Sequence, residues 1–247
     1  MSEILNKLPP LTLTEENGIR YLHFGTVWIQ GAMRIADPDA IELEYVRQMM
    51  AWMLFCERPK HIVQLGLGSG ALTKFCYRHF PHAQVTAIEL DPAVIGICRK
   101  QFGLPPNDER LNVMAMDALA YVQNSANHGA ADVLQVDLYD ELAEGPVFGS
   151  PEFYQACARC LSAKGIMTVN IYGDLDIHEE NIGAMMDAFD SVVWLPVVDG
   201  ENLVALAFKD SPSMDFTELR QRAAKVQRKT GLQADSWVDG LEEWMFC

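Results

Sequence analysis

The apolar runs between residues 61 and 209 are short and alternate with segments whose apolar residues recur at helical spacing. This pattern predicts strands that alternate with helices. The strands are expected at 61–67, 84–90, 110–116, 131–139, 165–173, 191–198 and 202–209, and the helices at 69–80, 91–102, 117–126, 150–165, 178–189 and 216–231. Such alternation is typical of parallel βαβ units with right-handed crossovers.

The last two apolar runs are joined by the tight-turn sequence Asp199-Gly200-Glu201. They predict an antiparallel hairpin at one edge of the sheet. A parallel sheet with an antiparallel final strand is the pattern of the methyltransferase-type variant of the nucleotide-binding fold. We therefore expect an α/β fold with a doubly wound, Rossmann-like sheet.

The segment before residue 61 has a different pattern. Two β-like runs, at 18–25 and 26–35, predict a small antiparallel hairpin unit. Residues 37–59 predict a long helix that Asp37 or Asp39 caps and Pro59 ends. The expected division is an N-terminal β-hairpin unit over 1–36 and a nucleotide-binding α/β domain over 37–247.

Composition narrows the class of protein. The chain has 247 residues, enough for one large domain with a small appendage, and a formal net charge of −15. This charge repels nucleic acid and anionic lipid and suits a cationic substrate. The alternative is that the charge only keeps the protein soluble. The sequence shows no membrane-length apolar run and no signal-peptide pattern, so we expect a cytoplasmic protein that binds neither nucleic acid nor membranes.

A glycine-rich turn follows the first strand of the main domain and reads Gly66-Leu67-Gly68-Ser69-Gly70. Glycines at alternate positions let a backbone turn sharply into a helix and approach a ligand closely. A structural turn without a ligand is the alternative. The spacing is GxGxG rather than the GxGxxG of nicotinamide sites, which favours an S-adenosyl compound.

Two acidic residues end the next two strands. Glu89 can accept hydrogen bonds from both ribose hydroxyls of a nucleoside. It could instead cap the following helix, but Asp91 suits that role better. Asp117, or the amide of neighbouring Ala118, can reach an adenine amino group, and Asp117 can also be a plain N-cap.

The fourth strand ends in Asp137-Leu138-Tyr139-Asp140, at the edge of the sheet where ligands bind in open α/β folds. A carboxylate there can accept a proton from an amine nucleophile beside a sulfonium. Asp140 could bind the far ammonium of a diamine, and we place Tyr139 on the substrate side. The alternative is that both aspartates cap or solvate a surface loop.

The run from Val133 to Asn170 resembles the core of the spermidine synthases, in which an Asp-x-x-Asp motif, a gatekeeping loop and a Phe-Tyr helix follow the fourth strand. The resemblance extends from about residue 18 to 208. Those enzymes transfer an aminopropyl group from decarboxylated S-adenosylmethionine to putrescine, and they commonly form dimers. The resemblance implies a homodimer. It also implies a role for each site residue: Asp137 is the general base, Asp140 anchors the diamine, Glu89 and Asp117 bind the nucleoside, and Gln30 and Tyr45 lie on the substrate side.

Several positions depart from that pattern. Ser69 stands where the family has the aspartate that grips the ammonium of the aminopropyl arm, and Val46 and Arg47 follow Tyr45 where polar and acidic residues are usual. Glu141 replaces a proline. These departures leave two alternatives open, a methyltransferase that uses intact S-adenosylmethionine and a nucleoside-binding paralogue without turnover.

The sequence does not predict a metal site. Cys157 and Cys160 form a CxxC pair within a predicted helix, and no second pair of ligands lies at zinc spacing. The six cysteines and the histidines are otherwise scattered, which is typical of reduced core cysteines in a reducing compartment.

Overall fold

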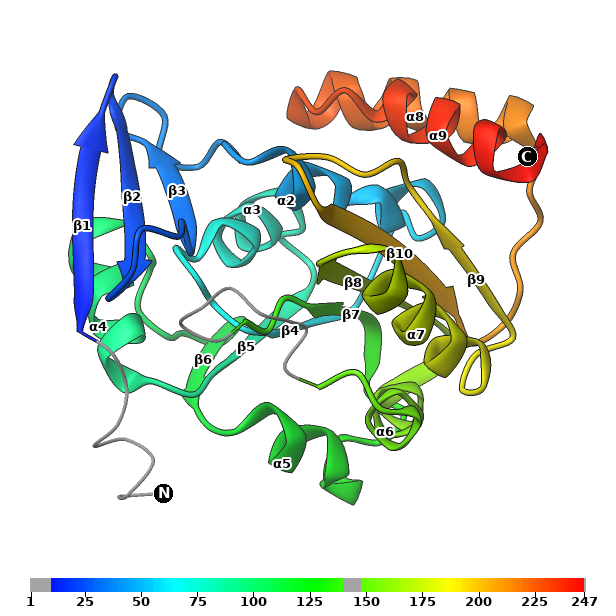
Figure 1. The fold of residues 1–247 in the computed structure, drawn as a ribbon, viewed down its shortest axis with the longest axis horizontal. Coiled ribbons are helices and arrows are strands. Elements are labelled where there is room, and N and C mark those ends of the chain that lie inside the picture. The colour runs from blue at the N-terminus through cyan, green and yellow to red at the C-terminus, as the bar shows by residue number, and fades with distance from the viewer. Residues whose placement is uncertain (1–9, 140–147, 247) are drawn as a thin grey trace.

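A seven-stranded sheet forms the centre of a computed structural model that describes residues 10–139 and 148–246 (Figure 1). Its strands are β4 (His61–Leu65), β5 (Gln84–Glu89), β6 (Leu111–Ala115), β7 (Ala131–Val136), β8 (Leu161–Tyr172), β9 (Ser191–Trp194) and β10 (Asn202–Phe208). Their order in the sheet is β6-β5-β4-β7-β8-β10-β9. β4 to β8 pair in parallel, and β10 is antiparallel to both β8 and β9. The predicted doubly wound sheet with an antiparallel final strand is confirmed.

Helices cover both faces of this sheet. They are α2 (Glu44–Gln48), η1 (Ala51–Leu54), α3 (Ala71–His79), α4 (Pro92–Gln101), α5 (Ala118–Gln123), η2 (Ser125–Asn127), α6 (Pro151–Cys160), α7 (Leu175–Met186), α8 (Phe216–Thr230) and α9 (Ala234–Phe246). Successive residues of a strand point to opposite faces, so Ile62 belongs to the core under η1, α3, α4, α8 and α9, and Val63 to the core under α5, α6 and α7.

The N-terminal unit is a separate antiparallel sheet of three strands, β1 (Leu11–Glu16), β2 (Ile19–Phe24) and β3 (Gly31–Arg34). β1 was not predicted. The turn between β1 and β2 is Asn17-Gly18, with φ values of 51° and 78°, the left-handed pair of a tight hairpin turn. An Asn-Gly pair between two β-like runs is a strong hairpin signal, and it could have identified this strand.

The long helix predicted over 37–59 is wrong. Residues 37–43 are an irregular linker, and only the short helices α2 and η1 follow. Met49, Met50, Trp52 and Leu54 are completely buried. Because η1 is enclosed between the sheet and α8, it needs no polar face, and a tight turn of 3-10 helix fits the space.

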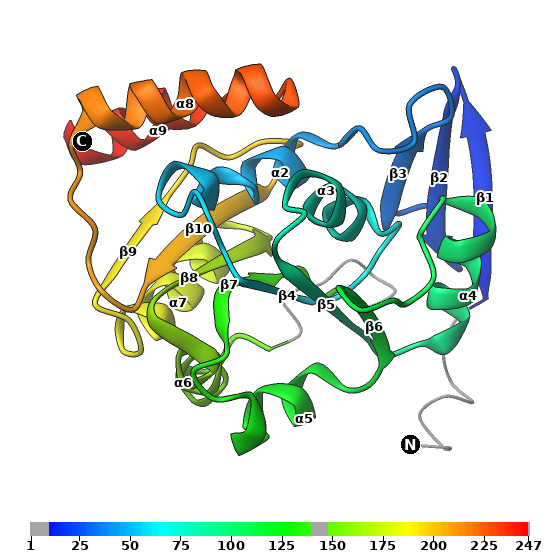
Figure 2. The same cartoon turned by 180° about the vertical axis from the view of Figure 1, so that it is seen from behind.

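Two other element boundaries differ from expectation. The helix predicted to run to Gly165 ends at Cys160, because Leu161 already pairs with Ala131 as the start of β8. The C-terminal helix α9 was not predicted at all. α8 and α9 form an antiparallel pair over η1 and β9, on the same side of the sheet as α2 (Figure 2).

Within the described residues, no helix combines the length and the apolar character needed to cross a membrane. The structure contains two separate sheets. The division into two units at residue 36 stays a prediction.

Candidate active site

Three glycines shape the turn after β4. Gly66, Gly68 and Gly70 have φ values of 92°, 51° and 73°, all in the region that favours glycine. A Cβ atom on Gly66 would lie 2.0 Å from the carbonyl oxygen of Asp137, and one on Gly68 would lie 2.8 Å from that of Gln30. The turn therefore touches both the end of β7 and the N-terminal unit, and a side chain at Gly66 or Gly68 would push them apart.

Glu89 is buried at the end of β5 and fixes the geometry of this turn. One of its oxygens accepts a hydrogen bond from the backbone N–H of Leu67 at 3.1 Å, and the other accepts from that of Asp91 at 2.9 Å. Burial raises the pKa of Glu89 to about 7, and these N–H donors limit the rise. Asp91 caps α4 through Ala93, as expected, which leaves Glu89 facing the cavity beside the turn.

Asp117 is the N-cap of α5, and its contact with an adenine stays a prediction. Its carboxylate accepts from the backbone N–H of Ala120 at 2.8 Å and so caps α5. Asp117 and Ala118 also line the same cavity as Glu89.

We call this space the inner cavity. It has a volume of about 140 Å³ and lies beyond the carboxyl ends of β4, β5, β6 and β7. Its apolar lining includes Leu67, Ile88 and Met116. The predicted site residues that line it are Gln30, Tyr45, Gly66, Gly68, Glu89, Asp117, Ala118, Asp137 and Tyr139.

Asp137 lies where the strand β7 ends. Its Oδ1 accepts a hydrogen bond from Nδ2 of Asn170 at 3.1 Å, and the phenol of Tyr45 also donates to this carboxylate. Burial raises the pKa of Asp137 to about 6, and the two donors limit the rise. The carboxylate is therefore ionised at neutral pH and is basic enough to accept a proton.

Tyr45, Gln30 and Tyr139 lie between the inner cavity and a second one, the outer cavity, of about 430 Å³. The Tyr139 hydroxyl donates to the carbonyl of Asn170 at 2.7 Å. The outer cavity is lined by Val27, Trp28, Ile29, Gln30, Leu43, Tyr45, Tyr139, Asn170, Tyr172, Asp199 and Asn202. The predicted diamine anchor, Asp140, lies outside the described residues.

Sequence reasoning missed Asn170 and Asp199. Asn170 is an amide residue in the mostly apolar second half of β8, near the ligand edge of the sheet, which is a signal that could have been used. Asp199 was interpreted only as part of a turn. No local pattern indicates that this turn reaches Tyr45, because the two residues are far apart in the sequence.

Ser69 and Gly70 do not line either cavity. Ser69 is buried, and its hydroxyl donates to the carbonyl of Ala32 at 3.1 Å. It lines a narrow pocket shared with Gln30, Tyr45 and Asp137. Gly70 begins α3 and packs toward Leu104, so its role in the structure is to shape the turn.

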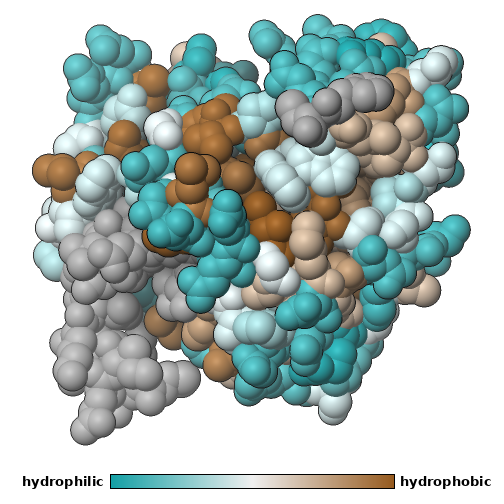
Figure 3. Space-filling model, turned by 45° about the vertical axis from the view of Figure 1, so that its right-hand side comes forward, coloured by the Kyte–Doolittle hydropathy of each residue, from teal (hydrophilic) through white to brown (hydrophobic). Residues whose placement is uncertain are grey.

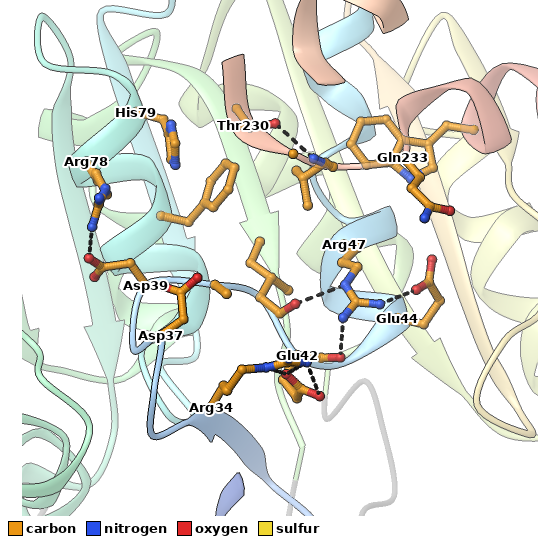
Figure 4. Close-up of a pocket in the computed structure, with 16 residues that line it drawn as sticks. Arg34, Asp37, Asp39, Glu42, Glu44, Arg47, Arg78, His79, Thr230 and Gln233 are labelled. Atoms are coloured by element: carbon orange, nitrogen blue, oxygen red, sulfur yellow. Dashed lines mark hydrogen bonds and ion pairs between the residues drawn. The ribbon is translucent and has the colours of Figure 1, made fainter. Parts of the chain in front are cut away.

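A larger cavity of about 610 Å³ lies between the linker after β3, α3 and the α8–α9 turn (Figure 4). Ion pairs surround it, and they join Arg34 to Glu42, Arg47 to Glu44, and Arg78 to Asp39. None of the predicted site residues lines this cavity. Size alone therefore does not mark the candidate active site.

Across residues 10–139 and 148–246, no three His, Cys, Asp or Glu side chains are grouped so that they could hold a metal ion. Cys157 and Cys160 are buried on α6 as free thiols.

Known proteins provide an independent comparison. A family model described as Spermine/spermidine synthase domain matches residues 42–194. The polyamine aminopropyltransferase of Chromobacterium violaceum is 32% identical over 238 residues, which are 96% of this chain and 90% of that protein. A probable spermidine synthase from Corynebacterium glutamicum has a similar structure, with a TM-score of 0.74 at 19% identity over 90% of this chain and 91% of that one.

The fold is also shared with a methyltransferase. Human methyltransferase-like protein 13, in complex with SAH, gives a TM-score of 0.68 at 23% identity over 77% of this chain and 93% of that one. The sheet topology and these structures show the methyltransferase-type α/β fold, and the family model with the curated relative defines a transferase. The chain belongs to the spermine/spermidine synthase family, and its curated relatives include polyamine aminopropyltransferases. The family resemblance noted in the sequence is thus confirmed.

Proposed function

We propose that the chain transfers the aminopropyl group of decarboxylated S-adenosylmethionine to a primary amine such as putrescine. The observation that carries this proposal is the position of Asp137 beside residues shared by the two cavities. A nucleoside in the inner cavity and an amine in the outer cavity would meet at this carboxylate.

In the proposed reaction Asp137 accepts a proton from the ammonium of the acceptor, because a protonated amine has no lone pair. The freed amine nitrogen attacks the methylene carbon bound to the sulfonium. A C–N bond forms, the C–S bond breaks, and the electron pair of that bond stays on sulfur. The products are methylthioadenosine and the extended polyamine.

The donor side of the proposal rests on the inner cavity. Glu89 would accept from the ribose hydroxyls, and Asp117 with the amide of Ala118 would lie at the adenine. Leu67, Ile88 and Met116 supply an apolar lining for the base. Asp140 as an anchor for the diamine is proposed from the family likeness alone.

Methyl transfer is a second candidate, and Ser69 favours it. The family's carboxylate is missing at this position, and the serine hydroxyl is occupied by the carbonyl of Ala32. A site without that negative charge repels the carboxylate of intact S-adenosylmethionine less.

A transfer assay separates the candidates. The chain is incubated with putrescine and either decarboxylated or intact S-adenosylmethionine, and the nucleoside products are separated. The proposal expects methylthioadenosine and spermidine in equal amounts from the decarboxylated donor. Methylation of the amine with release of S-adenosylhomocysteine would replace the proposal by the second candidate. Binding of methylthioadenosine without transfer from either donor would indicate a non-catalytic paralogue.

Replacing Glu89 by glutamine is expected to weaken methylthioadenosine binding about tenfold or more, because a charged acceptor for the ribose hydroxyls is lost. Those hydroxyls favour the ionised form of Glu89, whose pKa burial raises to about 7 in the free protein. Wild-type affinity should therefore fall as the pH is lowered below about 7, and that of the variant should not.

Titration calorimetry with methylthioadenosine at about pH 6 and about pH 8 measures both effects. Glu109→Gln is the matched control, since it removes the same charge from an exposed position before β6. Equal affinities for the Glu89 variant and wild type at both values would show that this carboxylate does not bind the nucleoside.

The homodimer and the cytoplasmic location expected from the sequence are part of the proposal. The family likeness supports the first, and light scattering during gel filtration tests it. A monomer across the working concentration range would remove the dimer from the account.

A further inference from the structure

Asn170, a residue that lines the outer cavity, has a buried polar atom whose hydrogen-bonding capacity is unused. Asn170 is 1% exposed and lines this cavity, and its Nδ2 donates to Asp137. Its Oδ1 is also buried and has no hydrogen-bond partner in the described part of the chain. A buried acceptor without a partner costs about 1–3 kcal/mol, so this atom indicates a ligand that donates an N–H or O–H next to Asp137.

The outer cavity is itself lined by a carboxylate, that of Asp199, whereas Asp137 lines the inner cavity. Asp199 lies in the loop between β9 and β10, with a φ of 51° that is uncommon for a residue with a side chain. Its Oδ2 accepts from the backbone N–H of Tyr45 at 3.2 Å, across 154 positions of sequence. This contact fixes the Asp199 carboxylate relative to Tyr45.

Tyr45 connects the two carboxylates. Its backbone nitrogen is bound by Asp199 and its phenol donates to Asp137, so the two acids lie about one tyrosine side chain apart. Burial raises the pKa of Tyr45 well above its usual range, and the charges of Asp137 and Asp199 add to the rise. An extended diamine with about four methylene groups, joined by bonds of roughly 1.5 Å, spans a comparable length.

The lining of the outer cavity suits the methylene groups and ammonium ends of such a molecule. Trp28 and Tyr172 lie on one wall with ring centroids 6.3 Å apart and planes at 63°. Aromatic faces attract ammonium groups and cover methylene groups. Val27, Trp28 and Ile29 remain 87%, 47% and 46% exposed, and hydrophobic surface gathers in the middle of the face shown in Figure 3.

We propose that Asp199 is the acceptor-specificity residue, which holds the far ammonium of a diamine whose reacting amine lies between Asp137 and Oδ1 of Asn170. This inference rests on the proposed function. It implies that the preferred acceptors are amines that carry a second positive charge. The family likeness gives this same ammonium to Asp140, which lies outside the described residues, and the structure adds Asp199 as a further carboxylate for it.

The test compares Asp199→Asn with wild type on two acceptors of equal carbon length, putrescine and the monoamine butylamine. Asparagine keeps an oxygen for the Tyr45 N–H and removes only the charge. The ratio of kcat/KM for putrescine to kcat/KM for butylamine is expected to fall about five- to tenfold, mainly through KM, because the site is partly open to solvent. The value for butylamine itself should not change.

The control is Asp190→Asn, which removes one charge at the opposite end of β9 and should leave the ratio unchanged. Asp199→Lys is a second variant, which should reject putrescine and improve the relative use of γ-aminobutyrate, whose far end is a carboxylate. An unchanged acceptor ratio in Asp199→Asn, with normal turnover, would overturn the inference.

Failure of the proposed function would look different, because wild type would then show no transfer to either amine. In that case putrescine binding is measured by calorimetry with methylthioadenosine present. The inference expects Asp199→Asn to weaken that binding about five- to tenfold, and equal binding by both proteins would overturn it.

Discussion

Replacing Asp137 by asparagine lowers kcat for amine transfer by about 10²–10⁴-fold and leaves methylthioadenosine affinity within about threefold of wild type. This fall in kcat is the usual contribution of a positioned general base. Asparagine can still accept the hydrogen bond from Asn170 that holds residue 137 in place, so the loss reports on proton transfer rather than on folding. Steady-state kinetics with decarboxylated S-adenosylmethionine and putrescine gives kcat, and calorimetry gives the affinity.

The pH dependence of kcat/KM is a second, independent test of Asp137 as the base. Burial raises the pKa of Asp137 to about 6, and only the ionised carboxylate accepts a proton. Wild-type kcat/KM for putrescine should therefore fall as the pH drops below about 6, where Asp137 becomes protonated. Asp190→Asn serves as the charge control. Retention of more than half the wild-type kcat by Asp137→Asn would exclude Asp137 as the base.

Replacing Gly66 by alanine is expected to have the second large effect, on stability and nucleoside binding together. The new Cβ would lie 2.0 Å from the carbonyl oxygen of Asp137, and the φ of 92° is strained for any residue with a side chain. A backbone atom on a buried sheet cannot move away cheaply. We expect a loss of about 2–4 kcal/mol in the free energy of unfolding and loss of methylthioadenosine binding.

Urea unfolding and calorimetry measure the two effects. Gly96→Ala is the matched control, because Gly96 lies within α4 and a Cβ there would meet no atom within 4 Å. That substitution should stabilise the protein by about 0.4–1 kcal/mol without changing binding. Wild-type stability and affinity in Gly66→Ala would contradict the assigned role of the glycine turn.

The strand and helix pattern of the central domain could be predicted because each element is encoded locally. Apolar runs that end in Gly66 or Glu89 identify both a strand and its ligand end, and the fold brings those ends together. Asp91, as the cap of α4, was predictable for the same reason. Local signals thus predicted most of the inner cavity.

The outer cavity could not be predicted in this way, because it depends on contacts between distant segments. Asp199 binds the backbone of Tyr45 across 154 positions of sequence, and Asn170 meets Asp137 across 33. Neither pairing has a sequence spacing that a motif could show. The outer cavity therefore needed the structure, whereas most of the inner cavity did not.

The wrong helix over 37–59 and the missed helix α9 have a physical explanation as well. Around Trp52 the chain is apolar on all sides, and burial rather than periodicity determines its conformation. In α9, Gly240 weakens the helical signal, yet it is required there because a Cβ would lie 2.4 Å from Cδ of Pro196. Tertiary packing overrides local propensity at both places.

The most direct measurement is a crystal structure of the chain with methylthioadenosine and putrescine bound together. Our account predicts ribose hydroxyls on Glu89, the thioether sulfur facing Asp137, and the two nitrogens of putrescine at Asp137 and Asp199. A nucleoside bound outside the inner cavity, or an Asp137 carboxylate turned away from the thioether, would contradict it.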